Sequence, residues 1–564
     1  MKMKKILIIA IAAALVLMGS CSKLNDKLDS QLNNPNSPTP DAADVNLYLN
    51  NLELNFNGFY QTASDLTDPL VRMQTMFGPT YLNAYSASSF DGIWGTAYTS
   101  IFKTANTMIP LAEAKGQFVH SGIAKVLKAY TMITLVDLFG DVPYTQANQG
   151  VDNTNPVVDK GRLVYDSALA LLDAGIADFA KTSSALPNND LFYAGSKTKW
   201  ATFAKTMKLK AYVQTRLVDQ ANVTTKINAL LAENDLIDTP AEDFVFNYST
   251  KDQAPDSRYG YYVGNYGTDA GAGAYLGNHF MWALTVEKGI VDPRARYYLY
   301  RQVVDVTNDP RVPDQTTLQF ALACYYRTSP YPAGTPYCLV GTGYWGRDHG
   351  NNEGTGPDNL LKTTWGLYPA GGEFDADQNK SVGQASTRVQ GAKGAGQAPI
   401  FLSSYTNFLK AEAALTLGTT GDAQALMLAG VNESFNKVKS FATTIGYSLP
   451  TTDTSKLITT YKQQQYVAKV QQLYQAAATT DAKLNVLVRE YYLAAWGNGL
   501  EPYNNYRRTG KPGNLQRTVQ PNEGDFIRSF FYPSIYVDFN KNAVQKTVTS
   551  VQVFWDTNPK DFIH

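Results

Sequence analysis

The sequence predicts a mainly α-helical protein, built from helical hairpins of the tetratricopeptide kind, with a loop-rich insert between two helical regions. Apolar residues recur every three to four positions in residues 45–238 and again in residues 400–564, as on helices that bury one face. Residues 239–399 carry many glycines and prolines and show little helical periodicity. The helical segments have similar lengths and are joined by short polar breaks, which is typical of stacked hairpins.

Residues 1–20 have the three parts of a secretory signal. Three lysines in the first five residues make a basic start, residues 6–18 are continuously apolar, and a small Gly-Ser pair follows. A membrane-spanning helix needs roughly 20 apolar residues, and this run is shorter. We therefore expect the chain to be exported rather than anchored by a helix of its own.

Cys21 comes directly after the small pair, in the stretch LVLMGSC. This placement resembles the lipobox of bacterial lipoproteins, in which the cysteine thiol is acylated and the signal is removed just before it. An ordinary secretory signal with a chance cysteine is the alternative. Residues 22–40 are rich in Asn, Ser, Pro and Asp and have no apolar periodicity. We expect residues 21–44 to be a lipidated tether.

The first helical region, residues 45–238, is clearest in the stretch IAKVLKAYTMITLVDLFGDVPY. Apolar residues follow the i, i+3, i+4, i+7 spacing from Ile123 to Ile133, which predicts a helix with one face buried. Gly140 can adopt the left-handed conformation that ends a helix, and Pro143 prevents the helix from resuming.

The second helical region, residues 400–564, shows the same spacing in stretches such as FLSSYTNFLKAEAALTL and DAKLNVLVREYYLAAWG. No strict repeat with the full tetratricopeptide consensus is visible. Residues 45–564 are expected to form a single domain, and two separate helical bundles are the alternative.

The loop-rich part, residues 239–399, contains the best candidates for ligand contact. The chain has 36 tyrosines against 4 histidines, which favours stacking and hydrogen bonding over imidazole chemistry. A sugar ring packs its C–H face on an aromatic plane and bonds its hydroxyl rim to Asp, Asn or Arg. Packing of these loops onto the helices is the alternative role. The candidates, which lie among flexible glycines, are Tyr259, Tyr261, Tyr262, Tyr266, Tyr344, Trp345, Arg347 and Asp348.

Charge and cysteine content exclude some classes of function. The full chain balances 49 basic against 49 acidic groups, so nothing suggests the clustered basic surface that nucleic acid requires. If Cys21 carries lipid, Cys324 and Cys338 remain as a pair in an oxidising compartment, where a disulfide can form. Two unpaired buried thiols are nearly as plausible, since the sequence gives no separation in space.

The sequence contains no recognisable metal or cofactor motif, and a differently built cation site is left open. The four histidines are isolated, whereas a zinc hydrolase typically places two of them one helical turn apart. The stretch DADQN at residues 375–379 begins like a calcium loop, but Lys380 and Ser386 occupy the positions that need Gly and Glu. We expect no enzyme activity, although two carboxylates on separate loops would leave no local signature of a glycosidase.

Six motifs follow one another along the chain: LVDLFGDVPYTQA at residues 135–147, KW at 199–200, DPR at 292–294, FLKAEAAL at 408–415, NNYRRTGKP at 504–512 and FFYPSIYVDFN at 530–540. In this order they resemble the motifs of the SusD/RagB family of surface nutrient-binding lipoproteins of the Bacteroidetes. Together they span nearly the whole mature chain. Tyr536 departs from the family pattern, which usually has glutamate there.

The motifs also have a physical interpretation that is mostly structural. Trp200, Ala411 and Ala413 look like helix-packing positions, and Arg507 and Arg508 are expected to pair with carboxylates or backbone carbonyls.

The resemblance implies an outer-membrane lipoprotein, tethered through Cys21 and facing the outside of the cell. Such a protein captures a nutrient at its loop-rich side and passes it to a partner SusC-like TonB-dependent transporter, on which its helical face docks. An oligosaccharide is the expected ligand and a peptide is the runner-up. A surface glycan-degrading enzyme and a helical adaptor without a small ligand are alternatives from other classes.

Overall fold

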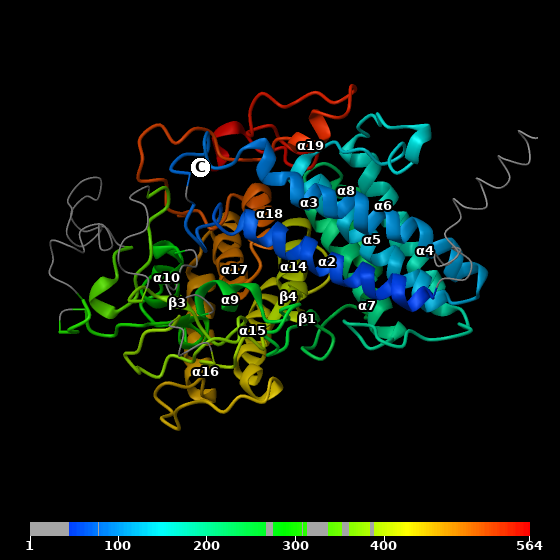
Figure 1. Ribbon diagram of the computed structural model, residues 1–564. Helices are drawn as coiled ribbons and strands as arrows, with labels where there is room; N and C mark the ends of the chain where they lie inside the picture. Colours follow the sequence, from blue (N-terminus) through cyan, green and yellow to red (C-terminus); the bar gives the residue numbers. More distant parts are fainter. Residues whose placement is uncertain are drawn as a thin grey trace, which may run out of the picture.

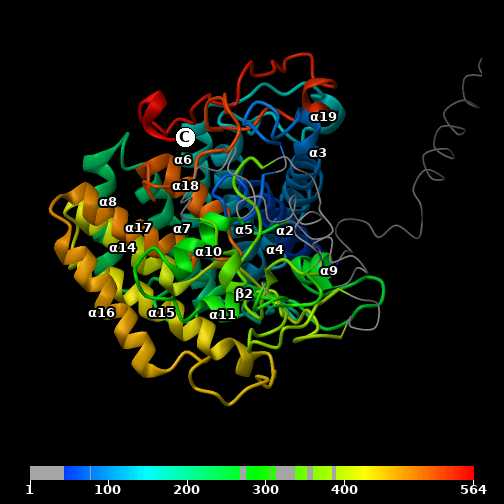
Figure 2. The same cartoon turned by 90° about the vertical axis from the view of Figure 1, so that its left-hand side faces the viewer.

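The computed structural model describes residues 44–76, 78–266, 275–306, 308–312, 337–351, 360–383 and 389–564. Helices dominate this part of the chain. In Figure 1 the helices of the two helical regions lie side by side, and the loop-rich middle of the chain covers one end of them. Figure 2 looks onto that end, where the short helices α9, α10 and α11 lie. The predicted mainly helical fold is confirmed.

The first helical region contains seven α-helices within the described residues, followed along the chain by the first strand. Short helical turns connect some of them: η2 (Ala87–Phe90), the π-helix η3 (Thr96–Phe102) and η4 (Gly150–Asp152). The α-helices are α2 (Val45–Thr67), α3 (Asp91–Gly95), α4 (Lys103–Ala114), α5 (Phe118–Phe139), α6 (Gly161–Ala180), α7 (Lys197–Gln214) and α8 (Gln220–Glu233).

The middle of the chain has only short elements. Its strands are β1 (Phe244–Asn247), β2 (Leu299–Tyr300), β3 (Thr364–Trp365) and β4 (Gln397–Phe401), and its helices are α9 (Gly260–Tyr266), α10 (Asn278–Thr285), α11 (Ala295–Tyr298) and η5 (Val340–Thr342).

The second helical region returns to long helices and ends in extended segments. It comprises α14 (Ser403–Leu417), α15 (Ala423–Thr444), α16 (Thr460–Ala476), α17 (Thr480–Ala494), α18 (Leu500–Thr509), α19 (Ser534–Val537) and η7 (Lys560–Phe562).

Consecutive long helices pack as hairpins in both regions. Helices α4 to α8 each contact the next along the chain, as do α14 to α17, and α7 contacts α14 where the two regions meet. Buried apolar residues from Val45 to Ile563 form one connected cluster. The two regions therefore share a core.

Helix α5 is buried more completely than its spacing predicts. Of its residues only Phe118 and Lys128 are not buried, because α2, α4, α6 and α7 surround it. It ends as expected at Gly140, whose φ of 79° is accessible at little cost only to glycine. The predicted one-sided helix is in fact the central helix of its region.

Asp137, in the motif LVDLFGD, connects four segments in the core. Its carboxylate accepts hydrogen bonds from the hydroxyl of Tyr165, from Trp555 Nε1 at 2.9 Å and from Asn504 Nδ2 at 2.8 Å. These partners come from α6, the C-terminal segment and α18. The motif thus has a structural role.

Arg508 forms the carboxylate pair that the sequence predicts. Its Nε and Nη2 lie 2.7 and 2.8 Å from the two oxygens of Glu412, and Arg216 Nε lies 2.9 Å from the same carboxylate. The two guanidinium groups lower the pKa of Glu412 to about 2, against the desolvation by burial that raises it. This buried cluster holds α18 and α14 together beside the end of α7.

A two-stranded antiparallel ribbon closes the base of the loop-rich part. Strand β1 pairs with β4, with Phe244 opposite Phe401 and Asn247 opposite Gln397. The chain therefore leaves the helical regions and returns to them at the same place.

Candidate ligand-binding site

Four of the predicted ligand contacts lie in or just before helix α9, and three of them are fully buried. Tyr259, Tyr262 and Tyr266 have no exposed surface. Tyr262 stacks on Tyr266 with ring centroids 4.7 Å apart, and the Tyr266 hydroxyl donates to the carbonyl of Trp365 at 2.6 Å. These rings pack the loop-rich part internally, which was the alternative role. Tyr261 is the half-buried exception.

The other four predicted contacts are also buried. Tyr344 is 7% exposed and lies under the guanidinium of Arg301, 4.9 Å from its centre. Trp345 donates from Nε1 to the Leu361 carbonyl at 2.8 Å. Arg347 lies 4.0 Å over the ring of Tyr275, and Asp348 accepts from Gln516 Nε2 at 2.7 Å. In this structure none of them offers a surface on which a sugar ring can stack.

Tyr261 lines a cavity of about 370 Å³ between the end of α2 and helix α9. This size lies at the lower end of the range of ligand pockets. The lining residues are Asp65, Pro69, Gln74, Thr75, Met76, Ala84, Tyr85, Gly260, Tyr261, Gly264 and Asn265.

Two carboxylates at the end of α2 share the hydroxyl of Tyr261. The distances from the hydroxyl are 2.5 Å to Asp65 Oδ1 and 2.7 Å to Asp68 Oδ2. Asp65 and Asp68 are three positions apart, so they lie on one face at the helix end. Gln74 Nε2 also donates to Asp68 Oδ2, at 3.0 Å. The result is a fixed polar wall beside an aromatic ring.

Asp68 is fully buried, and burial favours the protonated form of its carboxyl group. Desolvation raises the pKa of Asp68 from 3.8 to about 7, the hydrogen bond from Tyr261 opposes this, and the nearby charge of Asp65 adds to it. Its Oδ1 has no hydrogen-bond partner among the described residues. A carboxyl group that changes charge near neutral pH therefore lies directly behind the cavity lining, hydrogen-bonded to Tyr261.

Thr75 adds a second polar atom without a partner. Its side chain lines the cavity and is 4% exposed, and its Oγ1 makes no hydrogen bond within the described part of the chain. A buried hydroxyl without a partner is costly unless a ligand or water satisfies it.

Three aromatic rings stacked in series support Tyr261 from behind. Tyr261 stacks on Trp365 at 3.9 Å, Trp365 on Trp496 at 4.0 Å, and Trp496 on Phe280 at 4.7 Å. These rings come from α9, β3, the turn after α17, and α10. Offset stacking of this kind fixes ring orientation, so the tyrosine is positioned in advance.

Sequence reasoning found Tyr261 and missed the residues that face it. Asp65, Asp68, Gln74 and Thr75 lie in or just after a long helix, far from the aromatic loops in sequence. The one available signal was a pair of carboxylates three residues apart, directly before Pro69.

The two aspartates of the DADQN stretch at residues 375–379 form ion pairs with arginines. Arg301 Nε lies 2.7 Å from Asp375 Oδ2, and Arg296 Nη1 lies 2.9 Å from Asp377 Oδ1. Within the described residues no group of three or more His, Cys, Asp or Glu side chains is arranged to hold a metal. Cys338 is disulfide-bonded, whereas Cys324 lies outside the described residues, so their pairing stays a prediction.

Tyr536, where the resemblance leads one to expect glutamate, packs on an aromatic ring instead of forming an ion pair. Its ring centroid lies 4.9 Å from that of Trp94. No helix in the described ranges is both long and apolar enough to cross a membrane. Cys21, the predicted lipid attachment site, lies outside these ranges.

Two protein-family models match this chain, and both describe SusD-like proteins. Residues 35–306 match a family model described as starch-binding and associating with the outer membrane, and residues 373–554 match one described as SusD and RagB outer membrane lipoprotein. Comparison with curated proteins finds no match.

Solved structures share the fold at low sequence identity. A SusD/RagB family protein from Bacteroides thetaiotaomicron matches with a TM-score of 0.66 and 19% identity, over 92% of this chain and 100% of that one. A chitin-binding SusD homologue from Flavobacterium johnsoniae matches with a TM-score of 0.62 and 17% identity, over 92% and 99%. A SusD homologue from Bacteroides fragilis matches with a TM-score of 0.65 and 15% identity, over 92% and 100%.

Proposed function

Because the chain belongs to the SusD/RagB family of outer-membrane lipoproteins, we propose that it captures an oligosaccharide in the cavity between α2 and α9. It then passes the ligand to a partner SusC-like TonB-dependent transporter in the same membrane. Binding and handover require no bond to be broken. The nutrient-binding role at the outer membrane follows from the family, and the ligand class and the transporter are the proposed parts.

The observation that carries the proposal is the composition of this cavity. It combines the aromatic ring of Tyr261 with hydrogen-bonding groups of Asp65, Gln74, Thr75 and Asn265. A sugar ring offers a C–H face to an aromatic side chain and hydroxyl groups to carboxylates and amides. Small-molecule sites generally combine apolar surface with a few placed polar groups in this way.

The comparisons suggest which oligosaccharides to test first. One family model is described as starch-binding, and two of the similar structures are described as chitin-binding. Starch and chitin oligosaccharides therefore head the panel, and short peptides represent the runner-up ligand class.

Isothermal titration of the purified protein against this panel, with product analysis on the same samples, tests the proposal. We expect saturable binding of an oligosaccharide without cleavage. Tyr261→Ala should weaken it at least about tenfold, since a central aromatic hot-spot residue typically contributes about 2 kcal/mol or more and about 1.4 kcal/mol corresponds to a factor of ten. Thr75→Val keeps the shape of the side chain and removes only the unpartnered hydroxyl, so it should weaken binding about threefold or more without loss of stability.

Tyr461→Ala is the matched control, because this tyrosine is 69% exposed and lies outside the cavity. Binding unaffected by Tyr261→Ala and Thr75→Val would reject the site. Binding of peptides alone would change the ligand class, and cleavage products would make the protein an enzyme.

A further inference from the structure

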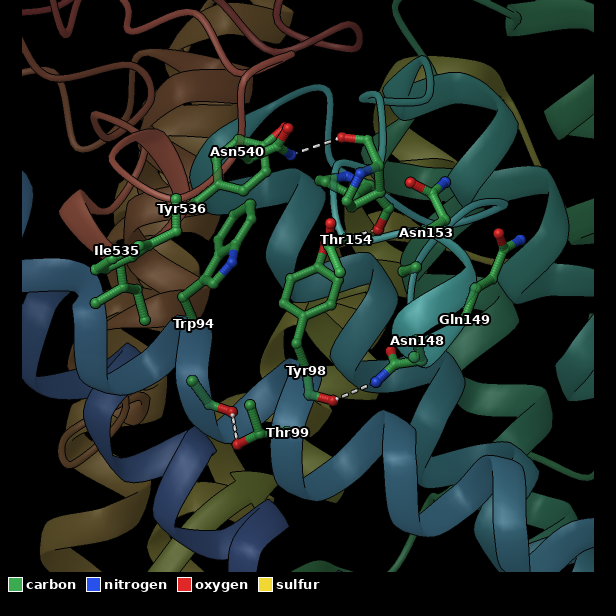
Figure 3. Close-up of a pocket in the computed structure, with 16 residues that line it drawn as sticks. Trp94, Tyr98, Thr99, Asn148, Gln149, Asn153, Thr154, Ile535, Tyr536 and Asn540 are labelled. Atoms are coloured by element: carbon green, nitrogen blue, oxygen red, sulfur yellow. Dashed lines mark hydrogen bonds between the residues drawn. The ribbon is translucent and has the colours of Figure 1, made fainter. Parts of the chain in front are cut away.

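A second cavity is lined in part by residues of α3 and α19, which lie away from α9, α10 and β3 of the loop-rich part in Figure 1. It measures about 350 Å³ and opens between η3, the segment 143–156 and the segment around α19 (Figure 3). It shares no lining residue with the cavity between α2 and α9. We propose that it is a second binding site, for one or two rings of a neutral saccharide.

The cavity carries no charged lining residue. Its walls are aromatic, amide, hydroxyl and small side chains, with the aromatic ones gathered on one side in Figure 3. Burying a charged ligand costs desolvation free energy, and this cavity has no charged side chain to compensate for it. The cavity therefore favours neutral ligands. The residues that line it are Trp94, Gly95, Tyr98, Thr99, Pro143, Ala147, Asn148, Gln149, Gly150, Asn153, Thr154, Pro156, Ile535, Tyr536, Phe539 and Asn540.

Exposed apolar surface at its rim favours an apolar face on the ligand. Phe539 is 81% exposed and Ile535 is 40% exposed, next to a half-buried Tyr98. Trp94 and Tyr536 form the floor, with ring centroids 4.9 Å apart and planes at 37°. The C–H face of a pyranose can cover these rings while its hydroxyl groups reach the amides.

Tyr536 brings an unpartnered hydroxyl to this cavity. The residue is 6% exposed, yet its hydroxyl makes no hydrogen bond within the described residues. Burial raises its pKa to about 12, so it stays a neutral donor and acceptor. A buried hydroxyl left unpaired costs free energy that a ligand hydroxyl would recover.

The wall that carries Tyr98 and Thr99 has an unusual backbone. Both residues belong to the π-helix η3, a conformation that often marks functional sites. The amide of Asn148 donates to the Tyr98 carbonyl at 2.8 Å, and Asn540 Nδ2 donates to the Pro156 carbonyl at 2.7 Å. These bonds, drawn in Figure 3, fix the spacing of the walls before any ligand arrives.

Calorimetric titration in a Tyr261→Ala background isolates this site from the first. The probes are chitotetraose and maltotetraose, which are neutral, and tetragalacturonate, which is charged. We expect one of the neutral probes to bind and the charged one not to bind. Phe539→Ala should weaken the binding about tenfold, and Tyr536→Phe, which preserves the ring packing, about threefold.

Val544→Ala is the control, because this residue is 79% exposed nearby but does not line the cavity. No binding of either neutral probe in this background would overturn the proposal, as would binding unaffected by Phe539→Ala and Tyr536→Phe. Equal binding of the charged probe would also overturn it. If Phe539→Ala abolishes binding in the otherwise native chain while Tyr261→Ala has no effect, this site stands and the proposed function of the other cavity fails.

Discussion

Asp68 is the side chain of the candidate site whose charge responds to physiological pH. Its raised pKa of about 7 comes first from burial, and its neighbours Asp65 and Tyr261 shift it in opposite directions. The folded chain thus keeps the Asp68 proton to a higher pH than the unfolded chain, in which the pKa is near 3.8. The contribution of Asp68 to stability is therefore full below about pH 4 and is lost progressively up to about pH 7.

Asp68→Asn should remove this pH dependence. Relative to the variant, the native protein should lose about 4 kcal/mol of unfolding free energy between pH 4 and pH 7.5, since each unit of pKa shift corresponds to about 1.4 kcal/mol. Denaturant unfolding of both proteins at several pH values measures the difference. Asp166→Asn, at an exposed position, is the control. If the free energies of unfolding of the native protein and of Asp68→Asn change in parallel with pH, the raised pKa of Asp68 is contradicted.

At the residue scale, the sequence predicted eight ligand contacts, and the structure places only Tyr261 of these at the candidate cavity. Tyr261 was found because it lies in an aromatic burst, but Tyr344 and Trp345 lie in a similar burst and are buried. Whether a ring in a glycine-rich loop packs inward depends on contacts such as Trp345 Nε1 to the Leu361 carbonyl. Asp65 is 196 positions from Tyr261, and only the fold brings the two together.

Helices α5 and α6 approach so closely that glycine is required at the contact. A Cβ atom at Gly122 would lie 2.5 Å from Phe179 Cε1, and one at Gly175 would lie 3.2 Å from the Gly122 carbonyl oxygen. Alanine at either position must displace a packed neighbour. The contact therefore leaves no space for a side chain on the central helix at Gly122.

Gly122→Ala should destabilise the protein by about 1–3 kcal/mol through overpacking. Gly92→Ala is the matched control: it lies in the short helix α3 with nothing within 4 Å of the added Cβ atom, and it should be neutral or stabilising. Thermal unfolding of the two variants gives the comparison. Equal melting temperatures for Gly122→Ala and the native protein would show that α5 and α6 can separate without cost.

At the element scale, periodicity identified the long helices and the position of the loop-rich part. It underestimated the burial of α5, since polar residues such as Asp137 occupy its other faces and are satisfied inside the core. Strands β1 and β4 were not predicted, because each is at most five residues long and its partner lies about 150 positions away. Short-range patterns carry no information about such a pair.

For the whole molecule, membership of an outer-membrane lipoprotein family places the chain at a membrane that no described helix can cross. Lipid on Cys21 is the expected attachment. Cys21→Ser should move the protein from the membrane fraction to the soluble exported fraction, because the lipid is attached to the cysteine thiol and serine has no thiol. Immunoblots of fractionated cells measure this. Ser22→Ala is the control, and unchanged membrane association of Cys21→Ser would point to another anchor.

The ribbon of β1 and β4 makes the loop-rich part an exchangeable cassette. Its two ends meet across one short antiparallel pair, so a segment of another length can be grafted there without moving the helical scaffold. The entropy of closing such a loop grows slowly, by about 0.6 kcal/mol for each doubling of its length. A graft must keep a flat ring at the place of Trp365, to lie against Trp496 of the scaffold, and it must also keep buried contacts such as that of Arg294 with Ser434 of α15. A chimaera that keeps this ring can acquire a new ligand preference from the donor loop while it retains the helical scaffold of the recipient.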